Sequence, residues 1–222
     1  MPDALRQLKR HPVPPGLTDG ITGWLLPREE HALHALGLLA DGPILEIGSW
    51  CGRSTVCLAT GIAARPIPVD FVTVELDPKI EQWPVIDGER YFRPSLDEDV
   101  LHGVGPGWDT EIAPVINGPG GVLGALTANL AAAGVADLVE VLTGDFRAID
   151  LPHDSYGLVF ADVMHDEVEI TRNAEHLTRL VRPGGLLACH DTTPENRELL
   201  ERWFRFSATA QVDSLFVGAV LQ

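Results

Sequence analysis

The sequence predicts an α/β fold in which a mostly parallel sheet is covered by helices on both faces. Short, continuously apolar runs alternate with amphipathic helical stretches, which is the pattern of a sheet that is buried on both sides. The last two β-like runs, at 204–212 and 214–221, follow each other directly and are expected to pair as an antiparallel hairpin. A length of 222 residues predicts a single domain over 1–222.

The expected elements follow one another along the chain. An N-terminal arm and helix occupy 1–42, where the helix opens at Pro27 because proline fits the first helical turn. Parallel strands are expected at 44–47, 71–76, 138–142, 157–161 and 186–189. Helices are expected at 53–64, 119–133, 167–181 and 195–202, where apolar residues recur at helical spacing.

One segment, 79–118, interrupts this alternation after the second strand and contains aromatic residues, prolines and glycines. Ser95 and Glu98 form a capping-box pattern, which predicts a short helix inside it. Long stretches without regular structure often carry function. Two interpretations stay open for this insertion: a lid over a substrate pocket, or a surface loop that could join two copies as a homodimer.

Composition limits the class of partner. The chain has 16 Lys+Arg against 32 Asp+Glu, a formal net charge of −16. Such a chain repels phosphate backbones and anionic membrane surfaces, so neither nucleic acid nor a membrane is expected as a partner. The three cysteines fit neither a disulfide framework nor a zinc site, and no secretory signal or membrane-spanning run is apparent. A cytoplasmic location is therefore expected.

A carboxylate stands at or just after the end of each predicted parallel strand. The carboxyl ends of parallel strands share one edge of the sheet, and ligands bind outside that edge. A single acid there is commonly a helix cap, but a series along one edge predicts a ligand rich in hydrogen-bond donors or positive charge. The acids are Glu46, Glu75, Asp145, Asp162 and Asp191.

The turn after the first strand contains two glycines, Gly48 and Gly52. Glycine lets the backbone approach a ligand closely, and the helix that follows offers unpaired N–H groups. The spacing is not that of a dinucleotide-binding turn, because Trp50 and Arg53 stand where glycines are required, and no phosphate-binding lysine follows.

Together, this turn and the ordered acids resemble class I S-adenosylmethionine-dependent methyltransferases over about 40–222. The resemblance implies a Rossmann-like, doubly wound, mostly parallel seven-stranded sheet with an antiparallel C-terminal hairpin and strand order 3-2-1-4-5-7-6. It also implies S-adenosylmethionine as cofactor and methyl transfer as activity.

The resemblance also assigns roles around the cofactor. Glu46 would orient the glycine turn or meet the ammonium group through water. Glu75 would accept hydrogen bonds from both ribose hydroxyls, and Asp145 would accept one from the adenine amino group. The alternative role of Glu75 is that of a plain strand-end acid, and the alternative role of Asp145 is to start a helix. The cofactor-binding residues implied are Glu46, Gly48, Ser49, Trp50, Gly52, Glu75, Leu76, Asp145, Phe146 and Asp162.

A narrower resemblance covers 159–165 and 183–191. These segments are similar to small-molecule O-methyltransferases grouped with macrocin O-methyltransferase and the cephalosporin-hydroxylase-like proteins, which hold a divalent ion between an acid after the fourth strand and an acidic pair after the fifth. The matching residues are Asp162, His190 and Asp191. Mg²⁺ or Mn²⁺ at this place would lower the pKa of a chelated hydroxyl.

The match departs from that family at two places. The turn from Asp162 to His165 lacks one of its carboxylates, and His190 replaces an acid although Mg²⁺ prefers oxygen ligands. Metal-assisted O-methyl transfer to a small molecule is the first expectation. The alternatives are metal-independent transfer with His165 or His190 as the catalytic base, or a non-methylating or non-catalytic member of the fold.

Overall fold

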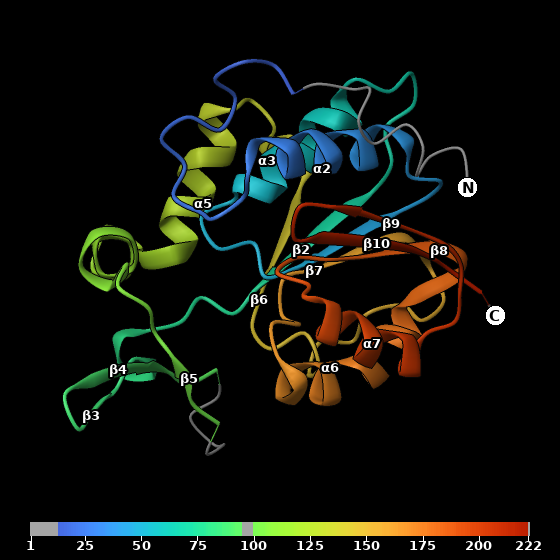
Figure 1. Ribbon diagram of the computed structural model, residues 1–222. Helices are drawn as coiled ribbons and strands as arrows, with labels where there is room; N and C mark the ends of the chain where they lie inside the picture. Colours follow the sequence, from blue (N-terminus) through green and yellow to red (C-terminus); the bar gives the residue numbers. More distant parts are fainter. Residues whose placement is uncertain (1–12, 95–99, 222) are drawn as a thin grey trace.

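The computed structural model describes residues 13–94 and 100–221, and its largest element is a seven-stranded sheet (Figure 1). Its strands are β1 (Ile44–Ile47), β2 (Phe71–Glu75), β6 (Glu140–Thr143), β7 (Tyr156–Ala161), β8 (Val181–Cys189), β9 (Phe206–Val212) and β10 (Leu215–Val220). The spatial order is β6-β2-β1-β7-β8-β10-β9, with β10 antiparallel between β8 and β9 and the other neighbours parallel. The predicted Rossmann-like fold class and strand order are confirmed.

Strand β1 lies in the middle of the parallel part of the sheet. Its residue Ile44 pairs with Phe71 of β2 on one side and with Leu158 of β7 on the other. All four residues of β1 are buried, as expected for a continuous apolar run between two layers of helices.

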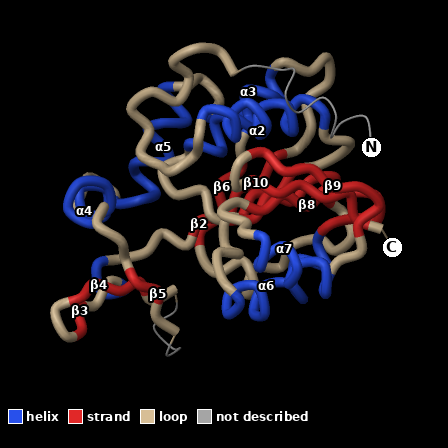
Figure 2. The backbone as a smooth tube through the Cα atoms, in the orientation of Figure 1, coloured by secondary structure: helices blue, strands red, loops and turns tan. Residues whose placement is uncertain are grey.

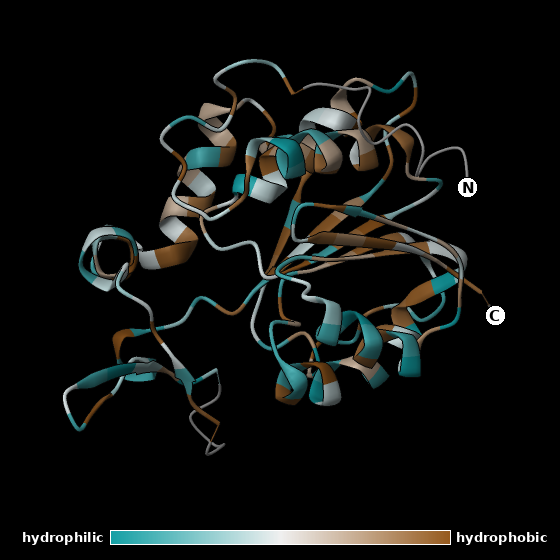
Figure 3. Ribbon diagram, viewed as in Figure 1, coloured by the Kyte–Doolittle hydropathy of each residue, from teal (hydrophilic) through white to brown (hydrophobic). Residues whose placement is uncertain are grey.

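Helices cover both faces of the sheet, as Figures 1 and 2 show. One layer consists of α2 (Pro27–Leu39), α3 (Arg53–Ala63) and α5 (Gly121–Ala132), and the other of α6 (Glu167–Leu180) and α7 (Pro194–Trp203). Each layer has its own apolar core against the sheet. Figure 3 shows the corresponding pattern, with apolar residues along the strands and polar residues on the outward surfaces of α6 and α7. In the two described ranges, no helix is long and apolar enough to cross a membrane.

The insertion forms a small unit that projects from the side of the main sheet (Figure 2). It contains η1 (Ile80–Gln82), β3 (Val85–Ile86), β4 (Glu89–Phe92), β5 (His102–Gly103), η2 (Trp108–Ile112) and α4 (Ala113–Ile116). The three strands pair antiparallel in the order β3-β4-β5. The short helix predicted at Ser95 lies outside the described residues.

Some predicted boundaries are wrong. Strand β8 begins at Val181 rather than after the glycines, because Gly184 takes a positive φ of 74° and the chain bulges within the strand instead of turning before it. The third parallel strand starts later than expected because residues 136–138 form the 3-10 turn η3 (Ala136–Leu138). Strand β9 starts at Phe206, beyond the end of α7.

Helices α2 and α3 pack with their backbones in contact at two glycines. A Cβ atom added to Gly61 would lie 2.1 Å from the carbonyl oxygen of His34, and one added to Gly37 would lie 2.1 Å from that of Leu58. Only glycine fits at either position without moving the helices apart.

We expect Gly61→Ala to lower the free energy of unfolding by about 1–3 kcal/mol, since the two helices must separate to admit the methyl group. Urea denaturation measures this change. Gly105→Ala is the control, because nothing lies within 4 Å of its added Cβ. Equal stability of Gly61→Ala and the wild type would contradict the packing described.

Candidate active site

The turn after β1 touches the turn after β7 through backbone atoms. Gly48 N–H donates to the carbonyl oxygen of Val74 (3.0 Å), and Asp162 N–H donates to that of Ile47 (2.9 Å), so the ladder continues beyond the strand ends. Gly48 has a φ of 86°, and a Cβ added there would lie 2.9 Å from the Asp162 carbonyl oxygen. Glycine is therefore required for this close approach.

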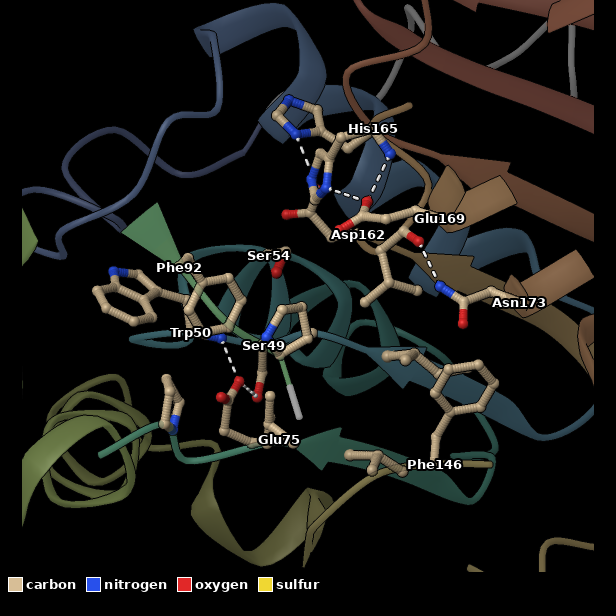
Figure 4. Close-up of a pocket in the computed structure, with 18 of the residues that line it drawn as sticks. Ser49, Trp50, Ser54, Glu75, Phe92, Phe146, Asp162, His165, Glu169 and Asn173 are labelled. Atoms are coloured by element: carbon tan, nitrogen blue, oxygen red, sulfur yellow. Dashed lines mark hydrogen bonds and ion pairs between the residues drawn. The ribbon is translucent and has the colours of Figure 1, made fainter. Parts of the chain in front are cut away.

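A cavity of about 300 Å³ opens at this carboxyl edge of the sheet. Figure 4 shows Glu75, Ser49 and Trp50 on one side of it, and Asp162 with His165 on the other. Most of the residues predicted for the site line this one cavity, although they come from five different turns. They are Gly48, Ser49, Trp50, Glu75, Leu76, Asp145, Phe146, Asp162, His165, His190 and Asp191.

Glu46 and Gly52 do not line the cavity, and their predicted roles beside the cofactor stay predictions. Glu46 is fully buried, where its carboxylate accepts hydrogen bonds from the hydroxyls of Ser54 (2.5 Å), Thr55 (2.6 Å) and Thr73 (2.8 Å). These bonds tie β1 to β2 and to the first turn of α3. The predicted role of Glu46 in orienting the glycine turn stays a prediction. Gly52 is the N-cap residue of α3.

Glu75 joins the glycine turn to the turn after β2. Its Oε2 accepts hydrogen bonds from the N–H of Trp50 (2.7 Å) and the hydroxyl of Ser49 (3.3 Å), and its Oε1 accepts one from the N–H of Asp77 (3.0 Å). Burial raises the pKa of Glu75 against the effect of these bonds. The carboxylate is therefore held in one orientation at the cavity wall.

Asp145 is held in a similar way by a cation. Its two carboxylate oxygens lie 2.9 and 3.0 Å from Arg147 Nε. Burial opposes ionisation of Asp145, but the hydrogen bonds from Arg147 outweigh it and lower the pKa. Beside it, Phe146 contributes an apolar surface to the same end of the cavity.

Five side chains form an alternating series that we call the His–carboxylate array: Glu29, His190, Asp162, His165 and Glu169. Asp162 Oδ1 lies 3.2 Å from His165 Nε2 and 3.2 Å from His190 Nδ1. The second nitrogen of His165 lies 2.7 Å from Glu169 Oε2, and that of His190 lies 3.3 Å from Glu29 Oε2. Each imidazole is thus placed between two carboxylates.

The pKa values of the array follow from this alternation. Burial lowers the pKa of His190, but Asp162 and Glu29 outweigh it and raise the value to about 10. The same balance raises the pKa of His165 well above its ordinary value, through Asp162 and Glu169. The two histidines in turn hold the pKa of Asp162 far below its usual range, although burial opposes this.

The predicted metal ligands Asp162, His190 and Asp191 are neighbours, with His190 Nδ1 3.7 Å from Asp191 Oδ1. A metal-binding histidine must offer a lone pair, but both ring nitrogens of His190 face carboxylates, which favours the cationic ring. Within 13–94 and 100–221, no group of three or more His, Cys, Asp or Glu residues is arranged to hold a metal ion. This arrangement does not support the predicted metal site, and a requirement for a metal ion stays a prediction.

Aromatic side chains from three segments form a continuous group that we call the aromatic wall. Trp24 of the arm lies 6.0 Å from Trp50 of the glycine turn, measured between ring centroids, and Trp50 lies 6.5 Å from Trp83 of the insertion. Trp83 in turn lies 4.5 Å from Phe92 and 5.3 Å from Trp108. All except Trp108 line the cavity.

The insertion also contacts the His–carboxylate array. His102 of β5 lies between two acids of α6, with Nδ1 3.2 Å from Asp166 Oδ2 and Nε2 3.4 Å from Glu169 Oε1. The other oxygen of Glu169 belongs to the pair with His165. The insertion is therefore joined to the cavity by a polar contact as well as by the aromatic wall.

A protein-family model described as a methyltransferase domain matches residues 45–192. The chain belongs to this methyltransferase family. The predicted enzyme class, a class I S-adenosylmethionine-dependent methyltransferase, is confirmed.

Solved structures share the fold of this methyltransferase at low sequence identity. The O-methyltransferase TomG from Streptomyces achromogenes has 18% identity and a TM-score of 0.51, covering 99% of this chain and 90% of that chain. An O-methyltransferase from Bacillus cereus has 16% identity and a TM-score of 0.51, with 99% and 91% covered. An RNA methyltransferase from Salinibacter ruber has 16% identity and a TM-score of 0.54, with 90% and 95% covered.

Sequence reasoning missed two members of the array in this methyltransferase, Glu29 and Glu169. Both stand in the first turn of a helix, where acids are favoured by the helix dipole. The helix dipole alone accounts for an acid at each of these two positions. The sequence therefore contains no separate signal that these acids contact histidines.

The buried carboxyl of Glu46 makes stability depend on pH. Burial raises its pKa from 4.5 to about 7, so the folded state holds the proton more tightly than the unfolded state. Its contribution is fully present below the unfolded value and is lost as pH rises through the folded value.

We expect Glu46→Gln to remove this part of the pH dependence, which amounts to roughly 3 kcal/mol in the unfolding free energy. Urea denaturation at about pH 5 and about pH 7.5 measures it for both proteins. The wild type should lose more stability than Glu46→Gln between these values. Parallel losses would show that Glu46 does not titrate in this range.

Proposed function

We propose that this methyltransferase transfers the methyl group of S-adenosylmethionine to a hydroxyl oxygen of a small molecule. The observation that carries the proposal is the position of Asp162. It lines the cavity between two histidines, and its backbone is in contact with the glycine turn. An acceptor hydroxyl that donates to Asp162 would stand beside groups able to take its proton.

The residues on the other side of the cavity fit the cofactor. The backbone at Gly48 carries no side chain and leaves room for a ligand along the turn. Glu75 would accept hydrogen bonds from the ribose hydroxyls and Asp145 from the adenine amino group, with Leu76 and Phe146 against the ring. When bound, S-adenosylmethionine supplies a methyl group on a positively charged sulfur.

Methyl transfer to a hydroxyl breaks the S–CH₃ bond, forms an O–CH₃ bond, and releases S-adenosylhomocysteine and the hydroxyl proton. Asp162 would hold the hydroxyl in line with the methyl group, which reduces the entropic cost of the reaction. His165 or His190 would accept the proton and must be neutral to do so. A positive charge in the cavity lowers the pKa of neighbouring imidazolium groups, which favours this neutral form.

A small acceptor agrees with the shape and charge of the site. The cavity is enclosed on one side by the aromatic wall, and the acidic chain, with a net charge of −16, disfavours a polyanionic acceptor. TomG and the Bacillus cereus protein are O-methyltransferases, which supports oxygen as the methylated atom, whereas the Salinibacter ruber protein acts on RNA. We therefore propose a small-molecule substrate and neither nucleic acid nor a membrane as partner.

Turnover assays test this function directly. The protein is incubated with S-adenosylmethionine and a panel of hydroxylated small molecules, and we expect S-adenosylhomocysteine together with a product heavier by one CH₂. EDTA should leave the rate unchanged, since the array supplies the proton acceptor without a metal ion. Loss of turnover with EDTA and recovery with Mg²⁺ or Mn²⁺ would favour metal-assisted transfer instead.

We expect Glu75→Gln to weaken the binding of S-adenosylhomocysteine by about tenfold or more, because a hydrogen bond to a charged group contributes roughly 1.5–3 kcal/mol. Isothermal titration calorimetry measures this affinity. Glu140→Gln is the control, since Glu140 is exposed on β6 and does not line the cavity. Equal affinities for the wild type and Glu75→Gln would contradict the proposed ribose contact.

A further inference from the structure

The aromatic wall joins two segments that lie outside the main sheet to the glycine turn. Trp24 belongs to the arm, Trp83 and Phe92 belong to the insertion, and Trp50 follows β1. These four rings line the same cavity as Asp162. The contacts proposed for the cofactor and for the acceptor hydroxyl use none of them, so the rings are open to a further role.

The indole N–H groups of the wall are not available to a ligand. Trp24 Nε1 donates a hydrogen bond to Glu111 Oε2 of η2 (2.6 Å). The Nε1 atoms of Trp50 and Trp83 are buried, and among the described residues nothing accepts a hydrogen bond from them. The three indoles therefore offer ring surfaces to the cavity and no hydrogen-bond donor.

Trp24 combines exposure with a fixed orientation. It is 53% exposed, whereas Trp83 is 6% exposed. The bond to Glu111 restrains the ring of Trp24, whose centroid lies 6.0 Å from that of Trp50. Apolar surface that is open and already oriented binds a ligand at a lower entropic cost than a mobile side chain does. Aromatic side chains of this kind are typical of small-molecule pockets.

The glycine turn places the ring of Trp50. This residue has a φ of 48°, in the left-handed region that a bulky residue rarely adopts. Its N–H donates to Glu75 Oε2 (2.7 Å), which holds the backbone in that conformation. Such strain persists where the surrounding structure enforces it, and it clusters at functional sites. The turn that would receive the cofactor therefore also fixes one ring of the wall.

The wall and the proposed adenine site lie on different sides of the cavity. Figure 4 shows Phe92 on one side and Phe146 on the other, with Ser49 between them. Phe146 and Asp145 are the residues proposed to receive the adenine, and both line the cavity. A cofactor bound in this way leaves the rings of the wall to the acceptor.

We propose that the acceptor is a phenol, a flat aromatic ring that bears the methylated hydroxyl, and that Trp24 is the residue that determines this specificity. The inference rests on the proposed function and adds a substrate class to it. Aromatic rings in stacked or edge-to-face contact gain energy beyond the burial of their area. A sugar would lose hydrogen bonds to water at this surface, and the indoles would not replace them.

The reaction is methyl transfer as described above. The S–CH₃ bond breaks, a bond forms between the methyl carbon and the phenolic oxygen, and the phenolic proton is finally released to water. The wall takes no part in these bond changes. It holds the plane of the ring, and with it the direction of the hydroxyl relative to the methyl group.

Matched pairs of probes test the substrate class. β-Naphthol is compared with decahydro-β-naphthol and catechol with cyclohexanediol, and methyl glucoside represents sugars. Isothermal titration calorimetry with saturating S-adenosylhomocysteine measures each affinity. We expect at least one phenol to bind about tenfold or more tightly than its saturated partner. Equal affinities within both pairs, tighter binding of methyl glucoside, or no binding of either phenol would overturn the proposal.

Trp24→Leu tests the specificity residue, because leucine keeps an apolar side chain but removes the ring. We expect the affinity for the bound phenol to fall by about fivefold or more, while that for S-adenosylhomocysteine stays within about twofold. Trp24→Phe retains a ring and should restore most of the affinity. Trp203→Leu is the matched control, since Trp203 is also exposed (43%) and does not line the cavity. An unchanged affinity in Trp24→Leu, or an equal loss in Trp203→Leu, would contradict the role of Trp24.

Glu111→Ala provides a second variant that removes no ring. Glu111 is exposed, so the fold does not depend on its side chain, but the substitution frees Trp24 from η2. We expect the affinity for the same phenol to fall by about threefold or more, because the ring must then be ordered on binding. An affinity equal to that of the wild type would show that a fixed ring is not required and would overturn this part of the proposal.

The measurements also separate this inference from the proposed function. A wild-type protein that binds no S-adenosylhomocysteine, or that methylates no hydroxyl, would refute the proposed function and the substrate class together. A wild-type protein that methylates a saturated alcohol or a sugar, but no phenol, would leave the proposed function standing and overturn the substrate class alone.

Discussion

The backbone contact between the turns after β1 and β7 is the constraint on which the cavity depends. It holds the glycine turn against Asp162 at a distance that only a residue without a side chain at position 48 allows. The two sides of the proposed reaction, the cofactor turn and the His–carboxylate array, are therefore fixed relative to each other by main-chain hydrogen bonds. The distance between the cofactor turn and the array therefore does not depend on the conformation of mobile side chains.

Charge alternation stabilises the array within that frame. Isolated charges are costly away from water, but each imidazole here faces two carboxylates, and Asp162 faces two imidazoles. Glu29 shows how strongly the pattern acts, because its hydrogen bonds overcome the effect of burial and lower its pKa to about 2. The array thus fixes the geometry of its members and favours their ionised forms.

The fold could be predicted from the sequence because apolar runs and amphipathic helices alternate, but the order of the strands came from the family resemblance. The convergence of Glu75, Asp145 and Asp162 could also be predicted, since the carboxyl ends of parallel strands share one edge. The position of the Glu46 side chain away from the cavity could not be predicted, because Glu46 precedes the end of its strand and is enclosed by hydroxyls of α3 and β2. Burial at that depth depends on neighbours that are distant in the sequence.

The arrangement around His190 does not support the predicted metal site, for a related reason. Its three residues are neighbours, as their spacing suggested, but the first turn of α2 brings Glu29 to the far side of His190. A contact between positions 29 and 190 has no local pattern in the sequence. The tertiary arrangement decides whether such a histidine presents a lone pair or a proton.

The aromatic wall has a consequence for spectroscopy. The sequence has five tryptophans, and four of them, Trp24, Trp50, Trp83 and Trp108, belong to this group, whereas Trp203 stands at the end of α7. Most of the indole fluorescence of the protein therefore originates around one cavity. A ligand in the cavity that shields the half-exposed Trp24 from solvent would change this emission. Tryptophan fluorescence therefore reports whether the cavity is occupied.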